Sequence, residues 1–172
     1  MPAYVAFLRA VNVGGTGKLP MAELTAMCRA EGYADVQTYI ASGNVVFRTP
    51  ASAARVKQVL GRRLLAFAGK PVGVVVRTAA EMGAVHAANP FSHAAPNRVV
   101  AIFLDSAPPP ETLAGVRGRK AEEMRLGQRE IYVHYGEGMG SSKLVIPAAK
   151  EGTARNMNTV AKLAMMAAAI DR

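Results

Sequence analysis

Residues 36–48 read VQTYIASGNVVFR, and this stretch decides the fold that we predict. Valine, isoleucine and aromatic residues fill both sides of the triplet Ser42-Gly43-Asn44. Glycine and asparagine both tolerate a positive φ, which a tight turn between two antiparallel strands requires. We therefore predict a β-hairpin with Ser42, Gly43 and Asn44 at its tip.

Strand and helix patterns continue on both sides of this hairpin. Residues 3–11 are largely apolar, as in a buried strand, and apolar residues then recur at helical spacing between Pro20 and Gly32. A second helix is expected over 51–68 and a further strand over 72–77. The apolar face expected for the second helix contains Val56, Leu60, Leu64 and Phe67. The order β-α-β-β-α-β is the split pattern of a ferredoxin-like unit.

The second half has a similar order of elements without a repeated sequence. The expected elements are a helix at 78–88, strands at 98–105, 122–126 and 130–135, a short helix at 111–116, an extended piece at 143–146 and a last helix at 158–170. No low-complexity linker separates the halves. We therefore expect an α+β protein of two ferredoxin-like (βαββαβ-type) halves, residues 1–77 and 78–172, packed together as one compact unit.

The composition excludes several classes of protein. The 172 residues include one cysteine, which cannot form an internal disulfide and favours a reducing compartment. Half of the residues (51%) are hydrophobic, which excludes wholesale disorder. No apolar run reaches the roughly 20 residues that span a bilayer, and the chain begins without the basic leader of a signal peptide. We expect a cytoplasmic protein with no membrane partner.

The net charge of +9 predicts an anionic partner, and the charge is concentrated. Residues 36–80 contain seven bases and no acid. On the helix expected at 51–68, Arg55 and Arg62 share a stripe and Arg63 lies towards the apolar side. Such a face contacts nucleic-acid phosphates without reading the base sequence, although a merely solvated basic helix has the same pattern. The RNP1 motif of RNA-binding domains is missing.

Several blocks along the chain together resemble the bacterial domain-of-unknown-function family 1697 (DUF1697). They are residues 8–15 (LRAVNVGG), 18–24 (KLPMAEL), 38–47 (TYIASGNVVF), 89–91 (NPF), 142–144 (SKL) and 153–156 (TARN). The resemblance covers nearly the whole chain and implies a bacterial α+β protein with two ferredoxin-like halves. It implies no reaction. At Met157, where the family pattern has tryptophan, an aromatic stacking role is missing.

Two glycine-rich segments are candidates for an anion site. Gly14-Gly15-Thr16-Gly17-Lys18 follows a strand and precedes a helix, where backbone N–H groups attract anions. It is not a Walker A loop, because that pattern needs glycine at Asn12 and serine or threonine at Leu19. The second segment runs from Gly138 to Lys143. If the halves are related by approximate symmetry, the two loops face one cleft; otherwise both are ordinary turns.

Polar residues at strand ends complete the candidate ligand site. Arg9 interrupts an apolar strand, so it emerges at an edge, pairs with an acid or meets a ligand. Arg155 precedes the last helix, where Thr153 or Asn156 could instead act as a cap while Arg155 is solvated. The full set of candidate ligand-binding residues is Arg9, Asn12, Gly14, Gly15, Lys18, Ser42, Asn44, Ser142, Lys143, Arg155 and Asn156.

The usual catalytic and metal-binding patterns are weak in this sequence. His86, His93 and His134 lack metal-ligand spacing, so we expect structural or surface imidazoles and no metal. Cys28 lies on an apolar stripe and is expected to be a packed thiol. Glu122 and its neighbour Glu123 point to opposite faces of the expected strand and do not form an acid/base pair.

Three hypotheses about function follow. The first is binding of a small phosphorylated or carboxylated ligand in a cleft lined by the glycine-rich loops, as an enzyme or a sensor. The second is sequence-nonspecific binding of nucleic acid through the basic 36–80 face, with Arg55, Arg62 and Arg63 on phosphates. The third is a homodimeric interaction module that pairs sheet edges. We rank the small anion first, because the family-like blocks fall on loops and strand ends. No cofactor is identified from the sequence, and a monomer and a homodimer both fit.

Overall fold

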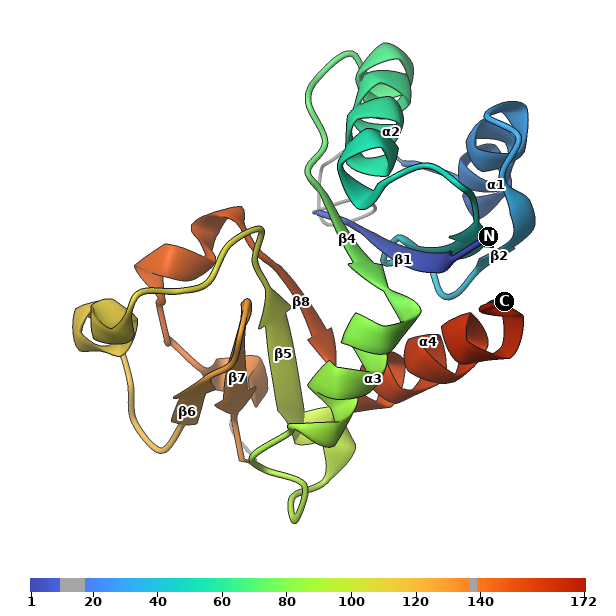
Figure 1. Ribbon diagram of the computed structural model, residues 1–172. Helices are drawn as coiled ribbons and strands as arrows, with labels where there is room; N and C mark the ends of the chain where they lie inside the picture. Colours follow the sequence, from blue (N-terminus) through green and yellow to red (C-terminus); the bar gives the residue numbers. More distant parts are fainter. Residues whose placement is uncertain (10–17, 137–138) are drawn as a thin grey trace. The chain divides into compact units, whose positions relative to one another are not determined.

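The computed structural model describes residues 1–9, 18–136 and 139–172 (Figure 1). The chain divides into two compact units, Met1–Gly83 with Leu163–Arg172, and Ala84–Lys162. We expected a division into 1–77 and 78–172. The observed boundaries fall inside two helices, α3 (Ala79–Ala87) and α4 (Met157–Ile170), so each of these helices contributes residues to both units. A helix that runs through the boundary has a continuous sequence pattern, so the sequence does not indicate where one unit ends and the other begins.

The first unit contains a four-stranded antiparallel sheet in the order β2-β3-β1-β4. Its strands are β1 (Ala3–Leu8), β2 (Ala34–Thr38), β3 (Asn44–Arg48) and β4 (Val74–Thr78). Helix α1 (Met21–Ala30) connects β1 to β2, and α2 (Ala53–Ala68) connects β3 to β4. The element order predicted from the sequence for this region is confirmed.

The ends of α2 are set by the residues that the sequence indicated. The Ser52 hydroxyl accepts a hydrogen bond from the Arg55 amide at 3.1 Å, and Gly69 ends the helix with a φ of 73°. Val56, Leu60 and Leu64 are buried as predicted, but Phe67 is 46% exposed. Residues 65–71 are exposed all round, so the last turn of α2 extends beyond the core.

One hydrophobic core lies between the first sheet and its two helices. Its buried members are Tyr4, Ala6, Leu8, Leu19, Leu24, Met27, Cys28, Tyr33, Val45, Phe47, Val56, Leu60, Leu64, Val74 and Val76. The rings of Tyr33 and Phe47 are stacked, with centroids 4.5 Å apart. Cys28 is fully buried, and burial raises the pKa of its thiol to about 12. The burial of Cys28 in this core confirms the prediction of a packed thiol. A thiol whose pKa is raised in this way is not a nucleophile near neutral pH.

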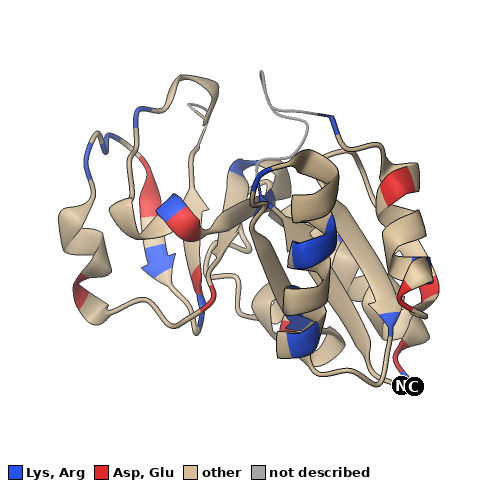
Figure 2. Ribbon diagram, turned by 90° about the horizontal axis from the view of Figure 1, so that it is seen from above, with Lys and Arg blue, Asp and Glu red and all other residues tan. Residues whose placement is uncertain are grey.

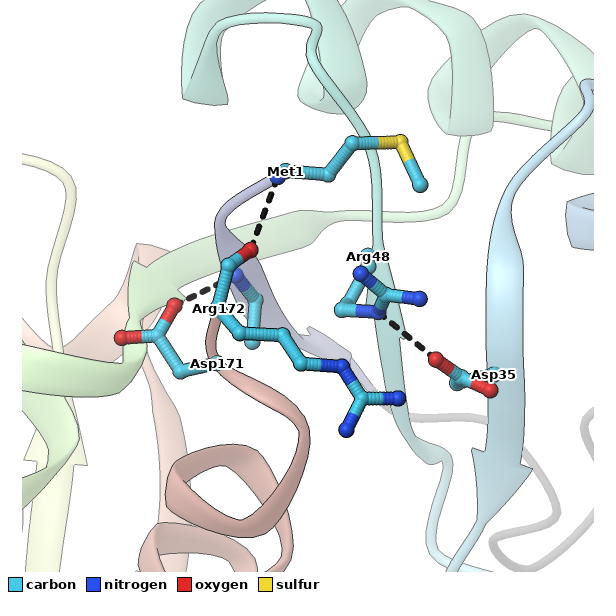
Figure 3. A network of polar contacts seen from close by, with 6 residues as sticks. Met1, Asp35, Arg48, Asp171 and Arg172 are labelled. Carbon is cyan, nitrogen blue, oxygen red and sulfur yellow. Dashed lines mark hydrogen bonds and ion pairs between the residues drawn. The ribbon is translucent and has the colours of Figure 1, made fainter.

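The two ends of the chain meet in the first unit. The Met1 ammonium group donates a hydrogen bond to the Arg172 carbonyl oxygen at 2.8 Å, and the Ala3 amide donates to Asp171 Oδ1 at 2.9 Å (Figure 3). These bonds join the start of β1 to the residues after α4. They are one reason why residues 163–172 belong to the first unit.

The second unit contains another four-stranded antiparallel sheet, in the order β6-β7-β5-β8. Its strands are β5 (Val99–Phe103), β6 (Glu123–Leu126), β7 (Glu130–His134) and β8 (Thr153–Asn156). The sequence did not predict β8, whose four residues lack an apolar alternation. The extended piece expected at 143–146 is an isolated bridge, in which Arg117 and Val145 exchange backbone hydrogen bonds of 2.9 and 2.8 Å.

Short 3₁₀ segments replace long helices in the second unit. The helix expected at 111–116 is the 3₁₀ segment η2 (Pro110–Gly115), and η4 (Pro147–Glu151) precedes β8. The core on this side is formed by Val100, Ile102, Leu104, Met124, Ile131, Val133 and Ile146. The fold is therefore a mixed α+β structure with two antiparallel sheets. In the part of the chain that the structure describes, no helix has the length and apolar character needed to span a membrane.

Candidate functional site

The candidate ligand-binding residues fall into two groups, one in each unit. Arg9, Lys18, Ser42 and Asn44 lie in the first unit, and the second unit contains Ser142, Lys143, Arg155 and Asn156. Asn12, Gly14 and Gly15 lie outside the described residues, as does Gly138 of the second glycine-rich segment. The shared cleft between the two segments therefore stays a prediction.

The first group gathers at one end of the first sheet. The Leu8 amide donates to the Gly43 carbonyl oxygen at 2.8 Å, and the Arg9 amide donates to the Gly73 carbonyl oxygen at 2.9 Å. These two bonds place the hairpin tip and the start of β4 beside the end of β1. The structure thus brings together Arg9, Ser42 and Asn44 at one end of the inner strands β1 and β3. Lys18 is an exposed residue just before α1.

Asn44 and Ser42 hold the hairpin together. Asn44 is fully buried, and its side-chain amide donates to the Tyr39 carbonyl oxygen at 2.9 Å and to Ser42 Oγ at 3.1 Å. Asparagine tolerates a positive φ, but in this turn the positive φ angles lie at Gly43 (92°) and Ile40 (52°) and not at Asn44. A β-branched residue rarely adopts this conformation, and Ile40 is also 49% exposed. Nothing in the sequence pattern marked Ile40.

In the second unit, Ser142 is tied to a carboxylate. Its hydroxyl donates to Glu122 Oε2 at 2.5 Å and accepts from the Leu144 amide at 3.2 Å. Glu122 is buried and also accepts from the Lys120 amide at 2.6 Å. The hydrogen bond from Ser142, followed by the backbone bond, lowers the pKa of Glu122. The Ser142 hydroxyl therefore connects its own residue to Glu122, directly before β6, while Lys143 is exposed.

Glu122 and Glu123 face in opposite directions, as predicted. Glu122 is buried, whereas Glu123 is exposed and lies 3.7 Å from Nδ1 of His134, its cross-strand partner. The adjacent carboxylates thus belong to different environments and do not act as a pair.

The segment Thr153–Asn156 carries the most unusual polar groups of the second unit. Asn156 Oδ1 accepts a hydrogen bond from the Thr159 amide at 3.0 Å, so Asn156 caps α4 as the alternative interpretation expected. Arg155 is partly buried, and burial lowers the pKa of its guanidinium to about 10. Its Nη1 donates to the Ala154 carbonyl oxygen at 2.8 Å. Arg155 is therefore only in part solvated, as that alternative had it, because its residue pairs with Ala101 in β5 and is partly buried.

Thr153 is a residue that we considered only as a helix cap. Its side chain is 3% exposed, and among the described residues its Oγ1 has no hydrogen-bond partner. Buried hydroxyls nearly always have one. The resemblance to the family pattern included residues 153–156, but no periodicity in the sequence distinguished Thr153 as a strand residue.

Two histidines lie near each other at the end of β7, an inner strand of the second sheet. The His93 and His134 rings have centroids 6.2 Å apart, and the Phe91 ring lies 5.6 Å from His134. The guanidinium carbon of Arg125 is 6.0 Å from the centre of the Phe91 ring. Within the described ranges, no group of three or more histidine, cysteine or acidic side chains is arranged to hold a metal ion.

The basic stretch carries less free charge than its composition suggests. Figure 2 shows its bases and the acids near them. Arg48 Nε lies 2.6 Å from Asp35 Oδ2, and Arg63 Nε lies 2.8 Å from Glu31 Oε1. Arg77 is buried, with 1% of its surface exposed. Asp35 and Glu31, the acids of these two ion pairs, precede residue 36. A count of charged residues over 36–80 therefore leaves them out.

The other candidate bases of α2 lie on its surface. Arg55 and Arg62 are exposed, and Arg55 Nη1 donates to Gln58 Oε1 at 3.0 Å. Three arginines of α2 are predicted to contact phosphates. Arg63 forms an ion pair with Glu31, whereas Arg55 and Arg62 have no acidic partner among the described residues.

Comparison with known proteins identifies the fold and the family. A solved structure described as that of the conserved bacterial protein SP0830 from Streptococcus pneumoniae matches with a TM-score of 0.78 and 22% identity, over 96% of this chain and 98% of the other. At this identity the likeness establishes the fold alone. No curated protein matches the sequence. The model of the family described as "Protein of unknown function (DUF1697)" matches residues 1–132, and the chain therefore belongs to this family.

Proposed function

We propose that this protein binds a small anionic ligand, phosphorylated or carboxylated, through Arg155 of the second unit. The observation that carries the proposal is the partial burial of this guanidinium on an edge strand, β8. A cation that has lost part of its hydration attracts an oxyanion more strongly than a fully solvated one does. Arginine also presents a planar fork that matches a carboxylate or a phosphate.

The register of the second sheet limits where the ligand can lie. Arg155 pairs with Ala101, Ala101 with Tyr132, and Tyr132 with Arg125. These four residues form one row across the four strands, with an arginine at each end. They are roughly 14 Å apart, because neighbouring strands are spaced about 4.8 Å. Ala101 and Tyr132 between them are buried. A small ligand therefore reaches Arg155 from the β8 edge and does not contact both arginines, which makes Arg125 a matched control.

The test is thermal unfolding with a panel of phosphate monoesters and small carboxylates. A ligand present at 100 times its Kd adds about 2.7 kcal/mol to stability. In a protein of this size that corresponds to a rise in Tm of roughly 5–10 °C. We expect Arg155→Gln to remove the rise and Arg125→Gln to keep it. The proposal is wrong if no compound raises the Tm of the wild type, or if Arg155→Gln responds as the wild type does.

The sheet order supports a further proposal about the architecture. We infer that each unit is a ferredoxin-like half, because the order β2-β3-β1-β4 recurs as β6-β7-β5-β8 with the same chain order of strands. A ferredoxin-like sheet has its connecting segments on one face, which leaves the opposite face and the edges for other contacts. Arg155 lies on such an edge.

Nucleic-acid binding through α2 is the second candidate, favoured by the exposure of Arg55 and Arg62. A face that contacts Z phosphates gives a slope of about −0.9Z in a plot of log K against log salt for duplex DNA. For these two arginines we expect a change of slope of roughly two units in the double variant Arg55→Ala/Arg62→Ala. A short labelled duplex that does not bind at low salt eliminates this candidate without affecting the first.

A further inference from the structure

Thr153 presents a buried hydroxyl that the rest of the described chain does not use. It lies in β8 with 3% of its surface exposed, and Oγ1 has no hydrogen-bond partner among the residues described. Valine has nearly the same shape and fills a buried strand position without a polar atom, so the hydroxyl lowers stability unless something bonds to it. Among the described residues, no group accepts this hydrogen bond.

The register of β8 places this hydroxyl beside Arg155. Thr153 pairs with Phe103 and Arg155 pairs with Ala101, two residues along β5. Because strand side chains alternate, Thr153 and Arg155 project from the same face of β8, with about 7 Å between their backbone positions. β8 is the last strand of its sheet, so this pair lies at an edge.

We propose that Thr153 Oγ1 donates a hydrogen bond to the oxyanion group that Arg155 binds. This inference rests on the proposed function and identifies the chemistry of the ligand. A guanidinium supplies charge and N–H donors, and the hydroxyl supplies one neutral donor in a fixed direction. A group with two or more acceptor oxygens on one atom, a carboxylate or a phosphate, accepts from both side chains at once. A halide has one acceptor atom and does not match the two parallel N–H donors of the guanidinium fork, so we expect it to bind more weakly.

The apo protein provides the first measurement, with Thr153→Val and Thr153→Ser as a matched pair. Valine keeps the shape of the side chain without the hydroxyl, and serine keeps the hydroxyl without the methyl group. Without added ligand, we expect Thr153→Val to unfold at the same temperature as the wild type or a higher one, because it removes a buried polar atom that lacks a partner. A lower Tm for Thr153→Val than for Thr153→Ser overturns the inference, since the hydroxyl would then have a partner within the folded protein.

The second measurement is binding, with inorganic phosphate, acetate and chloride as separate probes at constant ionic strength. We expect phosphate or acetate to raise the Tm of the wild type and of Thr153→Ser more than chloride does. The apparent affinity of Thr153→Val for the oxyanion should fall about tenfold, as for the loss of one hydrogen bond to a charged group. The phosphate and acetate arms show which oxyanion is preferred. Equal affinity of Thr153→Val and the wild type overturns the inference.

The failure of this inference and that of the proposed function have different signatures. If no oxyanion raises the Tm of the wild type, the proposed function fails and this inference fails with it. A different result affects Thr153 alone: oxyanions stabilise the wild type and Thr153→Val equally, but do not stabilise Arg155→Gln. In that case only the role of Thr153 is wrong. Should Thr153→Val not fold, Thr153→Ala provides the same comparison, because it also removes the hydroxyl while Thr153→Ser retains it.

Discussion

The two sheets have the same strand order but are covered differently. In the first unit, the connections from β1 to β2 and from β3 to β4 contain α1 and α2, helices of 10 and 16 residues. The corresponding connections in the second unit contain η2 and η4, 3₁₀ segments of 6 and 5 residues. The order of strands does not depend on the helices that cover them, because register and pairing belong to the backbone.

Because long helices cover one sheet and short 3₁₀ segments the other, different interactions stabilise the two units. Among the described residues, 15 buried side chains form the core under α1 and α2, and seven form the corresponding core of the second unit. The second unit adds polar and backbone contacts between its loops, such as the Arg117–Val145 bridge and the bond from Ser142 to Glu122. We therefore expect the first unit to be most sensitive to cavities, and the second to changes in its loops.

The largest expected effect is a cavity under α2. Leu60 is fully buried, and Leu60→Ala should lower the free energy of unfolding by about 2–5 kcal/mol, from lost burial and the cavity that remains. Leu113 in η2 is only partly buried, so Leu113→Ala should cost roughly 1 kcal/mol. Urea unfolding followed by circular dichroism measures both. An equal loss in the two variants would show that η2 covers its sheet as effectively as α2 does.

Two glycines with similar backbone angles provide a second comparison. Gly118 has a φ of 70°, and a Cβ at this position would collide with the carbonyl group of Lys143. Gly69 has a φ of 73°, and a Cβ there would meet nothing within 4 Å. Gly69→Ala should cost about 1–2 kcal/mol from the backbone conformation alone. Gly118→Ala should cost more, roughly 2–3 kcal/mol, because the loops on either side of the bridge must also move apart. Thermal unfolding measures both variants. A lower Tm for Gly69→Ala than for Gly118→Ala would contradict the expected order.

The pH dependence of Ser142→Ala tests the polar contact of the second unit. The pKa of Glu122 is lower in the folded protein, so its ionised form stabilises the fold at neutral pH. This contribution is lost as the pH falls from the ordinary pKa of a glutamate through the lowered one. Ser142→Ala removes the main cause of the shift, so its Tm should fall below that of the wild type at pH 7, and the gap should narrow towards pH 2.

Ser92 is exposed and lies in the same unit, so Ser92→Ala serves as the control. Its Tm should follow the wild-type curve at every pH. A gap between Ser142→Ala and the wild type that stays constant from pH 7 to pH 2 would mean that the hydroxyl does not act through the charge of Glu122.

The smallest expected effect concerns the ion pairs that neutralise part of the basic stretch. The Arg48 and Asp35 side chains are 16% and 38% exposed, and such pairs contribute about 0.2–1 kcal/mol. Arg48→Ala should therefore change the free energy of unfolding by less than about 1 kcal/mol, and 1 M salt should reduce the difference. Urea unfolding at low and high salt measures it. A larger loss that salt does not affect would indicate that packing of the Arg48 side chain, and not its charge, is responsible.

Most elements of the first unit could be predicted because several local patterns agree there. Ser52 and Gly69 mark the ends of α2, and Gly43 has the positive φ that the hairpin requires. The second unit was harder, since 3₁₀ segments and a four-residue strand are too short to show a period. β8 is held by its pairing with β5, a partner about 50 residues earlier in the chain, and no local pattern reports such a pairing.

The candidate site shows the same division. Arg155 and Asn156 could be selected from the sequence, and Asn156 could be interpreted correctly as a cap, because capping is a local interaction. The roles of Ser142 and Asn44 in fastening their own loops became clear only from their partners, Glu122 and Tyr39. The hydroxyl of Thr153 is without a partner among the described residues because the folded chain buries it, and composition and spacing do not encode that burial.

The amino-acid sequence alone determines the element types of the first unit, the packed state of Cys28 and the membership of the family, because these follow from periodicity, capping and residue identity along the chain. Tertiary structure decides which charges stay free and which polar groups are buried. It pairs Arg48 and Arg63 with acids, partly buries Arg155 and leaves Thr153 Oγ1 without a described partner. The physical reason is that electrostatic energy and hydrogen bonding depend on distance in space, and folding sets those distances between residues remote in sequence.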